Sequence, residues 1–520
     1  MCIRDSFKTI LKNVFSNYVG MFGTIVIAFL LSPFLVHTLG DTRYGIWSII
    51  TALTGYMALL DLGVGSAVAK YVSKHKATDD YKSINVIFSA GIVILLVVGA
   101  ILIALSPFIA DLVVSAFKFD SSLRDTVHTL VIIASVDIAI FIASGVFFGA
   151  FYGFQRNEVT NAALLFAAFI KAVCHYLVLS NGYGLVAMGI VSLVGNSLMV
   201  FLLAYLMRKI EPQVEITTRH ANKSSIGSVF NYSKFTFLTM LGMQLIYYSD
   251  AFVVGYFLSA AAITIYTIPW SLSEYSNKLL QAVAQTFVPV FSEQEVLNKK
   301  AIYDTYITGT KGVLLLSNLL CIGVLTLGDE FVGIWMGPRY AVECSAILTI
   351  MFLTLLIKSP QLLSYSILLG TANHQKFSIY NMIFSIANLI LSILLVQKFG
   401  LIGVAAATAI TQILFYAVVT PIMTSKVINF SLTDYFKKTY LRIVPASLLL
   451  FALLSWFAKY HPPGGFLSLI GLALIGAAAY LALAYWTLLD ASERELANRQ
   501  LKRLAEKIVS KLRGSSTEVQ

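Results

Sequence analysis

The sequence predicts an all-α membrane protein with about 14 transmembrane helices, and two observations support this. Of the 520 residues, 58% are hydrophobic and only 12% are charged, whereas a soluble chain carries about a quarter charged residues. Apolar runs of about 20 residues recur along almost the whole chain, and each is long enough to cross the hydrocarbon core as a helix. Because these runs are continuous rather than alternating, we expect helices and not a β-barrel.

The predicted elements follow one another with short connections. Fourteen spans are expected at 16–38, 46–69, 84–106, 127–150, 160–180, 184–207, 235–258, 262–291, 305–327, 344–369, 378–397, 401–424, 441–458 and 464–486. Residues 1–6 fit no element. The predicted domains are an amphipathic segment (1–15), an N-lobe of spans one to six (16–207), a cytoplasmic linker (208–234), a C-lobe of spans seven to twelve (235–424), spans thirteen and fourteen (441–486), and a basic amphipathic tail (487–520).

Basic residues predict the orientation of these spans. Lys and Arg are concentrated in alternate connections, and such connections are normally cytoplasmic. Both termini are therefore expected in the cytoplasm. The amphipathic segment and the tail are expected to lie as helices on the anionic inner leaflet. The net charge of +11 is explained by this topology, so we expect no nucleic-acid partner.

The first and second halves of the chain resemble each other in sequence. Leu39 has a counterpart at Leu258, Gln155 at Gln375 and Gly184 at Gly400, with offsets of 216 to 220 residues. Three matches in order predict an internal duplication, with six spans in each copy. Because six is even, the two lobes would be parallel repeats related by an axis along the membrane normal. A cleft between two such lobes suits alternating access.

Other functional classes lack their usual signals. The four cysteines form no CxxC pair, and no P-loop, GxSxG, HExxH or dinucleotide fingerprint occurs, so we expect no catalytic residues, no metal and no cofactor. His175 is expected to be a packed core residue. A membrane-embedded glycan polymerase or ligase would need a large outer loop, and the longest outer connection is only 107–126.

Two stretches carry a family resemblance. Residues 39–47 (LGDTRYGIW) and 55–65 (GYMALLDLGVG) resemble the N-terminal signature of bacterial polysaccharide exporters. These are the O-antigen and capsule-type oligosaccharide flippases of the multidrug/oligosaccharidyl-lipid/polysaccharide exporter superfamily. The resemblance covers spans one to twelve and includes the Gly-x5-Gln-Arg element at 149–156.

The resemblance implies a function and its partners. A member of this family flips undecaprenyl-pyrophosphate-linked oligosaccharide across the bacterial inner membrane, coupled to a cation gradient. The implied partners are the lipid-linked oligosaccharide, membrane lipids, a coupling cation (H⁺ or Na⁺) and glycan-assembly proteins. The alternatives within the superfamily are a cation-coupled drug antiporter and a peptidoglycan-precursor flippase.

Charged residues at membrane depth are the candidate site residues, because each costs about 2.5–3.5 kcal/mol to insert and so normally faces a cavity or a partner. An anionic diphosphate needs an electropositive path, and the candidates for substrate binding are Lys171, Lys278, Lys311 and Lys358. The candidates for ion coupling are Asp61, Asp137, Asp250 and Glu274.

Each candidate also has a structural interpretation. Lys278 follows Glu274 by four residues, so the two share a helix face and can neutralise each other. Lys311 can extend to the cytoplasmic surface. Asp61 can cap or kink a helix beside Gly63 and Gly65. Asp137 and Asp250 can each pair with a lysine.

Overall fold

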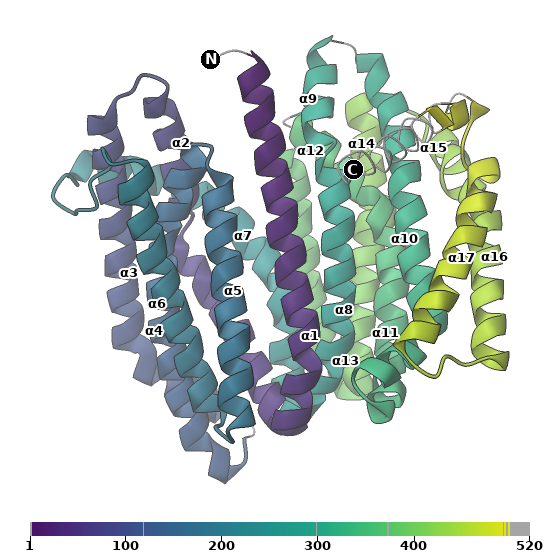
Figure 1. Cartoon of the computed structure of the whole chain (residues 1–520), viewed down its shortest axis with the longest axis horizontal. Helices are drawn as coiled ribbons and strands as arrows, with labels where there is room; N and C mark the ends of the chain where they lie inside the picture. Colours follow the sequence, from purple (N-terminus) through teal and green to yellow (C-terminus); the bar gives the residue numbers. More distant parts are fainter. Residues whose placement is uncertain are drawn as a thin grey trace, which may run out of the picture. The chain divides into compact units, whose positions relative to one another are not determined.

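The computed structural model describes residues 3–117, 119–297, 299–371, 374–491, 493–495 and 498–499, and every regular element in these ranges is helical (Figure 1). The α-helices are α1 (Ile3–Met57), α2 (Val64–Lys76), α3 (Tyr81–Ala116), α4 (Arg124–Gly153), α5 (Asn157–Ser180), α6 (Leu185–Ile210), α7 (Lys223–Phe257), α8 (Ala260–Gln285), α9 (Val288–Leu297), α10 (Lys299–Trp335), α11 (Pro338–Lys358), α12 (Leu362–Gly370), α13 (His374–Ile413), α14 (Thr420–Ile428), α15 (Leu432–Lys438), α16 (Tyr440–Tyr460) and α17 (Phe466–Thr487).

Ten helical stretches of the described chain are long and apolar enough to cross a membrane, which confirms the helical membrane class. Their exposed surfaces are apolar: Leu467 on α17 is 87% exposed and Phe201 on α6 is 72% exposed. The lipid tails of a bilayer cover such apolar surfaces, while the backbone N–H and C=O groups form hydrogen bonds within each helix. Two of the ten stretches, 15–61 and 375–428, are much longer than one crossing requires.

Both long stretches turn back on themselves at a glycine. Gly400, within α13, has a φ of 57° and a non-helical backbone. Asn388 before it donates to Thr408 after it at 2.9 Å, although 20 residues of straight helix would hold the two about 30 Å apart. The two arms of α13 therefore lie side by side. A positive φ is accessible to glycine without the strain that a Cβ would introduce.

α1 likewise turns back at Gly40, which has a φ of 71° and a non-helical backbone. Phe34 before it contacts Tyr176, and Trp47 after it contacts the neighbouring His175, with ring centroids 4.7 and 5.6 Å apart. A straight helix would place Phe34 and Trp47 about 20 Å apart. α1 begins at Ile3, so the predicted segment 1–15 and the predicted span 16–38 share one helix.

Four predicted spans are not continuous helices. Span 262–291 is divided between α8, which ends at Gln285, and α9, which begins at Val288. Span 46–69 is interrupted by a 3₁₀ turn at Ala58–Asp61, after which Leu62 and Gly63 are left-handed. A second 3₁₀ turn at Ser359–Gln361 divides α11 from α12 within span 344–369. A π-helical turn at Leu414–Val419 interrupts span 401–424. Such local changes of helix type frequently mark functional positions.

The chain forms two compact units. One contains residues 1–271 and 378–411, and the other contains residues 272–377 and 412–520. The core of the first includes Val64, Val68 and Phe88 among residues of α2, α3, α4 and α6, and the core of the second includes Leu450, Leu454 and Tyr480 between α10, α16 and α17. The predicted lobes and linker stay predictions. The side chains of 1–14 and most of the predicted tail, including all of 501–520, lie outside the described residues.

Candidate functional site

The site in the first unit is built on close contact between α2 and α4. Gly145, Gly149 and Gly153 recur every four residues along α4, and thus on one face of that helix. A Cβ added at Gly149 would overlap the carbonyl oxygen of Gly65, and one at Gly153 would lie 2.8 Å from the carbonyl oxygen of Ala69. Small residues at this spacing let membrane helices approach until their backbones touch.

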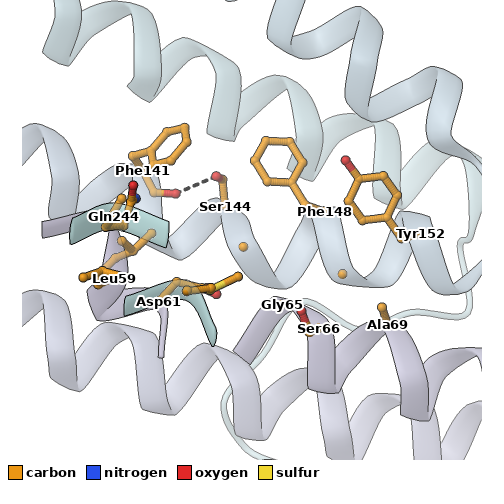
Figure 2. Close-up of a pocket in the computed structure, with 15 residues that line it drawn as sticks. Leu59, Asp61, Gly65, Ser66, Ala69, Phe141, Ser144, Phe148, Tyr152 and Gln244 are labelled. Carbon is orange, nitrogen blue, oxygen red and sulfur yellow. Dashed lines mark hydrogen bonds between the residues drawn. The ribbon is translucent and has the colours of Figure 1, made fainter. Parts of the chain in front are cut away.

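Beside this contact lies a cavity of about 530 Å³. This volume is within the range of about 300–1,000 Å³ that is typical of small-molecule sites. Its walls come from the 58–61 turn, α2, α4 and α7, and are formed by Ala58, Leu59, Asp61, Gly65, Ser66, Ala69, Phe141, Ile142, Ser144, Gly145, Phe148, Gly149, Tyr152, Met240 and Gln244. Figure 2 shows Phe141, Ser144, Phe148 and Tyr152 in sequence along α4, with Asp61, Gly65, Ser66 and Ala69 on the facing segment.

Asp61 carries the single formal charge among the described residues that line this cavity. It precedes the N-terminus of α2, whose backbone N–H groups favour a negative charge, and the amides of Gly65 and Gly63 interact with its carboxylate. Its Oδ1 atom is buried and has no hydrogen-bond donor among the described residues. The capping interpretation therefore accounts for the position of Asp61 but leaves one carboxylate oxygen without a partner.

Asp250 on α7 is a buried carboxylate of a different kind, 3% exposed. It accepts hydrogen bonds from Tyr266 of α8 at 2.6 Å, from Thr408 at 2.8 Å and from Ser392 at 3.3 Å. Ser392 and Thr408 lie on opposite arms of α13, so the turn at Gly400 is what brings both hydroxyls to Asp250. No Lys, Arg or His is paired with this carboxylate among the described contacts. An expected lysine partner is therefore not seen.

Lys171 and Asp137 are joined through an amide. Lys171 donates to the side-chain oxygen of Asn196 at 3.0 Å, and Asn196 donates to Asp137 at 2.7 Å. The side chain of Lys171 crosses Gly195, where an added Cβ would overlap it. His175, one turn after Lys171, lies 3.2 Å from the carbonyl of Met188, which agrees with a packed core residue. Lys171 and Asp137 thus balance each other across α4, α5 and α6.

Three other candidates gather in the second unit. Glu274 lies 3.8 Å from Lys278, so the expected shared helix face is present. Lys358, at the end of α11, donates to Gln412 at 3.0 Å, and its charge also interacts with Glu274. The 3₁₀ turn begins directly after Lys358, and the π-helical turn begins two residues after Gln412.

The buried ammonium of Lys311 pairs with two carboxylates. It lies 2.9 Å from Asp490 and 2.7 Å from Glu493, and Asp490 also pairs with Arg442. The side chain of Lys311 is only 2% exposed, so it does not extend to the surface. This ion-pair cluster attaches the segment that follows α17 to α10 and α16.

Several site residues were not anticipated from the sequence. The glycine face of α4 had a readable signal in its spacing of four residues. No sequence signal pointed to the cavity residues Ser66, Tyr152 and Gln244, or to the hydroxyl groups that surround Asp250. No group of three or more His, Cys, Asp or Glu side chains suited to a metal ion occurs in the described part of the chain.

Comparisons with known proteins agree on one family. Residues 10–295 match the family model described as polysaccharide biosynthesis protein. The chain is 24% identical over 419 residues to the probable low-salt glycan biosynthesis flippase Agl15 of Haloferax volcanii, covering 78% of this chain and 80% of that protein. It is 20% identical over 410 residues to a putative O-antigen transporter of Shigella flexneri, covering 78% of this chain and 96% of that protein.

The fold also matches a solved structure. The lipid II flippase MurJ in an inward closed conformation superposes with a TM-score of 0.70, covering 91% of this chain and 98% of that one. The two sequences are 18% identical, so this likeness shows a shared fold.

Proposed function

The chain belongs to the polysaccharide biosynthesis protein family, and from this premise we propose that it translocates a lipid-linked oligosaccharide across the cell membrane by alternating access. The observation that carries the proposal is the match, over 78% of the chain in each case, to proteins named a glycan biosynthesis flippase and an O-antigen transporter. Membrane-length helices that enclose a cavity and buried charges suit such a transporter. The proposal involves no chemical reaction on the sugar.

The proposed topology has 14 spans. The hairpins at Gly40 and Gly400 each supply two crossings, and α7 and α8 add two more to the apolar stretches. The positions of the turns between helices support the predicted duplication. The turn at Gly40 in the first half corresponds to the junction of α7 and α8 in the second half. The junction of α5 and α6 at Gly184 corresponds to the turn at Gly400. Spans thirteen and fourteen follow the repeat, and both termini face the cytoplasm.

The polar head of the proposed substrate carries an anionic diphosphate, while its prenyl tail can remain in lipid. Among the four candidate lysines, Lys358 is the strongest substrate contact. Its only hydrogen bond among the described residues is to a neutral amide, that of Gln412, and it lies beside two changes of helix type. Lys278 is about half exposed and is the second candidate. Lys171 and Lys311 already have buried carboxylates as counter-charges, directly or through Asn196.

Asp250 is the strongest candidate for ion coupling. A buried carboxylate without a cationic partner is costly unless it takes up a proton or a cation. Its three hydroxyl neighbours supply further oxygen atoms of the kind that a hard cation such as Na⁺ prefers. A cation that binds differently in two conformations can bias the transport cycle. Asp137 and Glu274 lie near lysines and are weaker candidates.

Reconstituted vesicles test the proposal. Purified protein should transfer a pyrophosphate-linked oligosaccharide from one leaflet to the other without changing its mass, and an imposed Na⁺ or H⁺ gradient should alter the rate. Asp250→Asn should remove the response to the gradient, while the exposed Asp120→Asn serves as its matched control. Transfer of a cationic drug, with none of the oligosaccharide, would instead indicate a drug antiporter. A change in sugar length without leaflet transfer would indicate a polymerase.

A further inference from the structure

The cavity beside α2 and α4 has the wrong charge for a diphosphate. Among the described residues that line it, Asp61 carries the single formal charge, and none is a Lys, Arg or His. An anion placed there would be repelled by this carboxylate at short range. The occupant must therefore be neutral or cationic where it meets Asp61.

The lining is instead complementary to a ligand rich in hydroxyl groups. Asp61 Oδ1 is a buried acceptor that has no donor within the described chain, and a hydroxyl donating to a carboxylate makes a charge-assisted hydrogen bond. Ser66 and Tyr152 add hydroxyls that can donate or accept. Ser144 donates its hydroxyl to the carbonyl of Phe141 and Gln244 donates its amide to the carbonyl of Gly55, so these two offer acceptor oxygens to a ligand.

The apolar part of the lining completes the match. Phe141, Phe148 and Tyr152 follow one another along α4 at intervals of seven and four residues and supply flat aromatic faces. A ring that carries C–H groups on its faces and hydroxyls around its edge can satisfy such a wall and the polar groups together. Gly65, Gly145 and Gly149 also line the cavity and add no side-chain volume, so the backbone itself forms part of the wall.

We propose that this cavity is the subsite for the sugar rings of the transported lipid-linked oligosaccharide, with Asp61 accepting hydrogen bonds from sugar hydroxyls. The inference rests on the proposed function and assigns the two parts of the substrate head to different places. The sugar occupies the Asp61 cavity, and the diphosphate binds elsewhere. Asp61 is then a binding residue for the glycan and not a coupling residue for a cation.

A cysteine-protection experiment separates the two parts of the substrate. Ser66→Cys, in the full-length protein with its four native cysteines replaced by alanine, places a thiol in the cavity, and Ser73→Cys on the exposed face of α2 is the matched control. Three probes are compared: the polyprenyl-pyrophosphate-linked oligosaccharides extracted from the source cells, the free oligosaccharide released from them by mild acid, and undecaprenyl pyrophosphate without sugar. The intact lipid and the free oligosaccharide should each slow maleimide labelling at position 66 at least about fivefold, and undecaprenyl pyrophosphate should not. Labelling at position 73 should stay unchanged with all three.

A transport assay on the same protein keeps the inference distinct from the proposed function. Asp61→Asn should raise the half-saturating concentration of the lipid-linked oligosaccharide about tenfold, the effect of weakening one hydrogen bond to a charged group, and should leave the response to an ion gradient intact. Equal protection by undecaprenyl pyrophosphate, or a lost gradient response with unchanged half-saturation, would overturn the sugar subsite while transport persists. Absence of any oligosaccharide transfer by the unmutated protein would reject the proposed function itself.

Discussion

The ammonium of Lys311 lies 2.7 Å from the carboxylate of Glu493, a residue 182 positions later in the chain. This ion pair fastens the segment after α17 to the interior of the second unit, and Asp490 joins it from the same segment. A lysine that would ordinarily face a cavity or the surface is thereby used to hold two distant parts of the chain together.

Replacing Lys311 by alanine should destabilise the protein, because the largely buried Glu493 would lose its counter-charge, whereas the half-exposed Asp490 keeps Arg442. Breaking a buried pair by removing one partner costs about 3–5 kcal/mol. The expected result is a markedly lower midpoint of thermal unfolding in detergent, whereas the exposed Lys398→Ala should leave the midpoint nearly unchanged. Equal midpoints for the two variants would show that the cluster adds no stability.

The same cluster predicts a pH dependence. Hydrogen bonds from Arg442 and Lys311 hold the pKa of Asp490 below its ordinary value. A carboxyl whose pKa is lowered on folding stabilises the protein above its unfolded pKa of about 3.9, and this contribution is lost as the pH falls through the lower, folded value. Thermal midpoints measured from neutral pH downward should fall less steeply below about pH 4 for Asp490→Asn than for the unmutated protein.

Gly149→Ala should separate α2 from α4. Its Cβ would overlap the carbonyl oxygen of Gly65, which cannot rotate away as a side chain could. Forcing a methyl group into such a contact costs about 1–3 kcal/mol, and it should also reduce transport by displacing the wall that carries Asp61. Gly471→Ala on α17 is the matched control, since nothing lies within 4 Å of its added Cβ. Thermal midpoint and oligosaccharide transfer should be measured for both variants.

Lys171 and Asp137 should behave as a coupled pair. Lys171→Met leaves Asp137 buried beside Asn196 without its counter-charge, and we expect a loss of about 3 kcal/mol in the free energy of unfolding. Adding Asp137→Asn removes the second charge and should recover most of that loss. A double-mutant cycle on thermal stability measures this coupling. Additive losses would instead favour a separate role for Lys171 at a substrate site.

The helical membrane class was predictable from the sequence because apolar length alone decides it. The turns at Gly40 and Gly400 were also expected, as junctions between spans. The interruption at Ala58–Asp61 was predicted only as an alternative, a cap or kink at Asp61 beside Gly63 and Gly65, because the apolar pattern continues through it.

The candidate site was less predictable because its meaning depends on tertiary contacts. Lys171, Lys311 and Lys358 look alike in sequence, yet one reaches Asp137 through Asn196, one reaches Glu493, and one reaches Gln412. Asp250 was identified as a candidate from its depth. The hydroxyl neighbours of Asp250 could not be identified from the sequence. Ser392 and Thr408 lie more than a hundred residues away, and Tyr266 lies on the next helix, α8.

The glycine contact between α2 and α4 has an evolutionary consequence. A side chain at position 149 or 153 would collide with the backbone of α2, whereas the side chains of Ser66, Ala69, Phe148 and Tyr152 line the cavity. If the cavity holds the sugar, as proposed, substitutions at these four positions would change the cargo while the scaffold stays fixed. Libraries that randomise only these four positions offer a direct route to transporters with altered cargo.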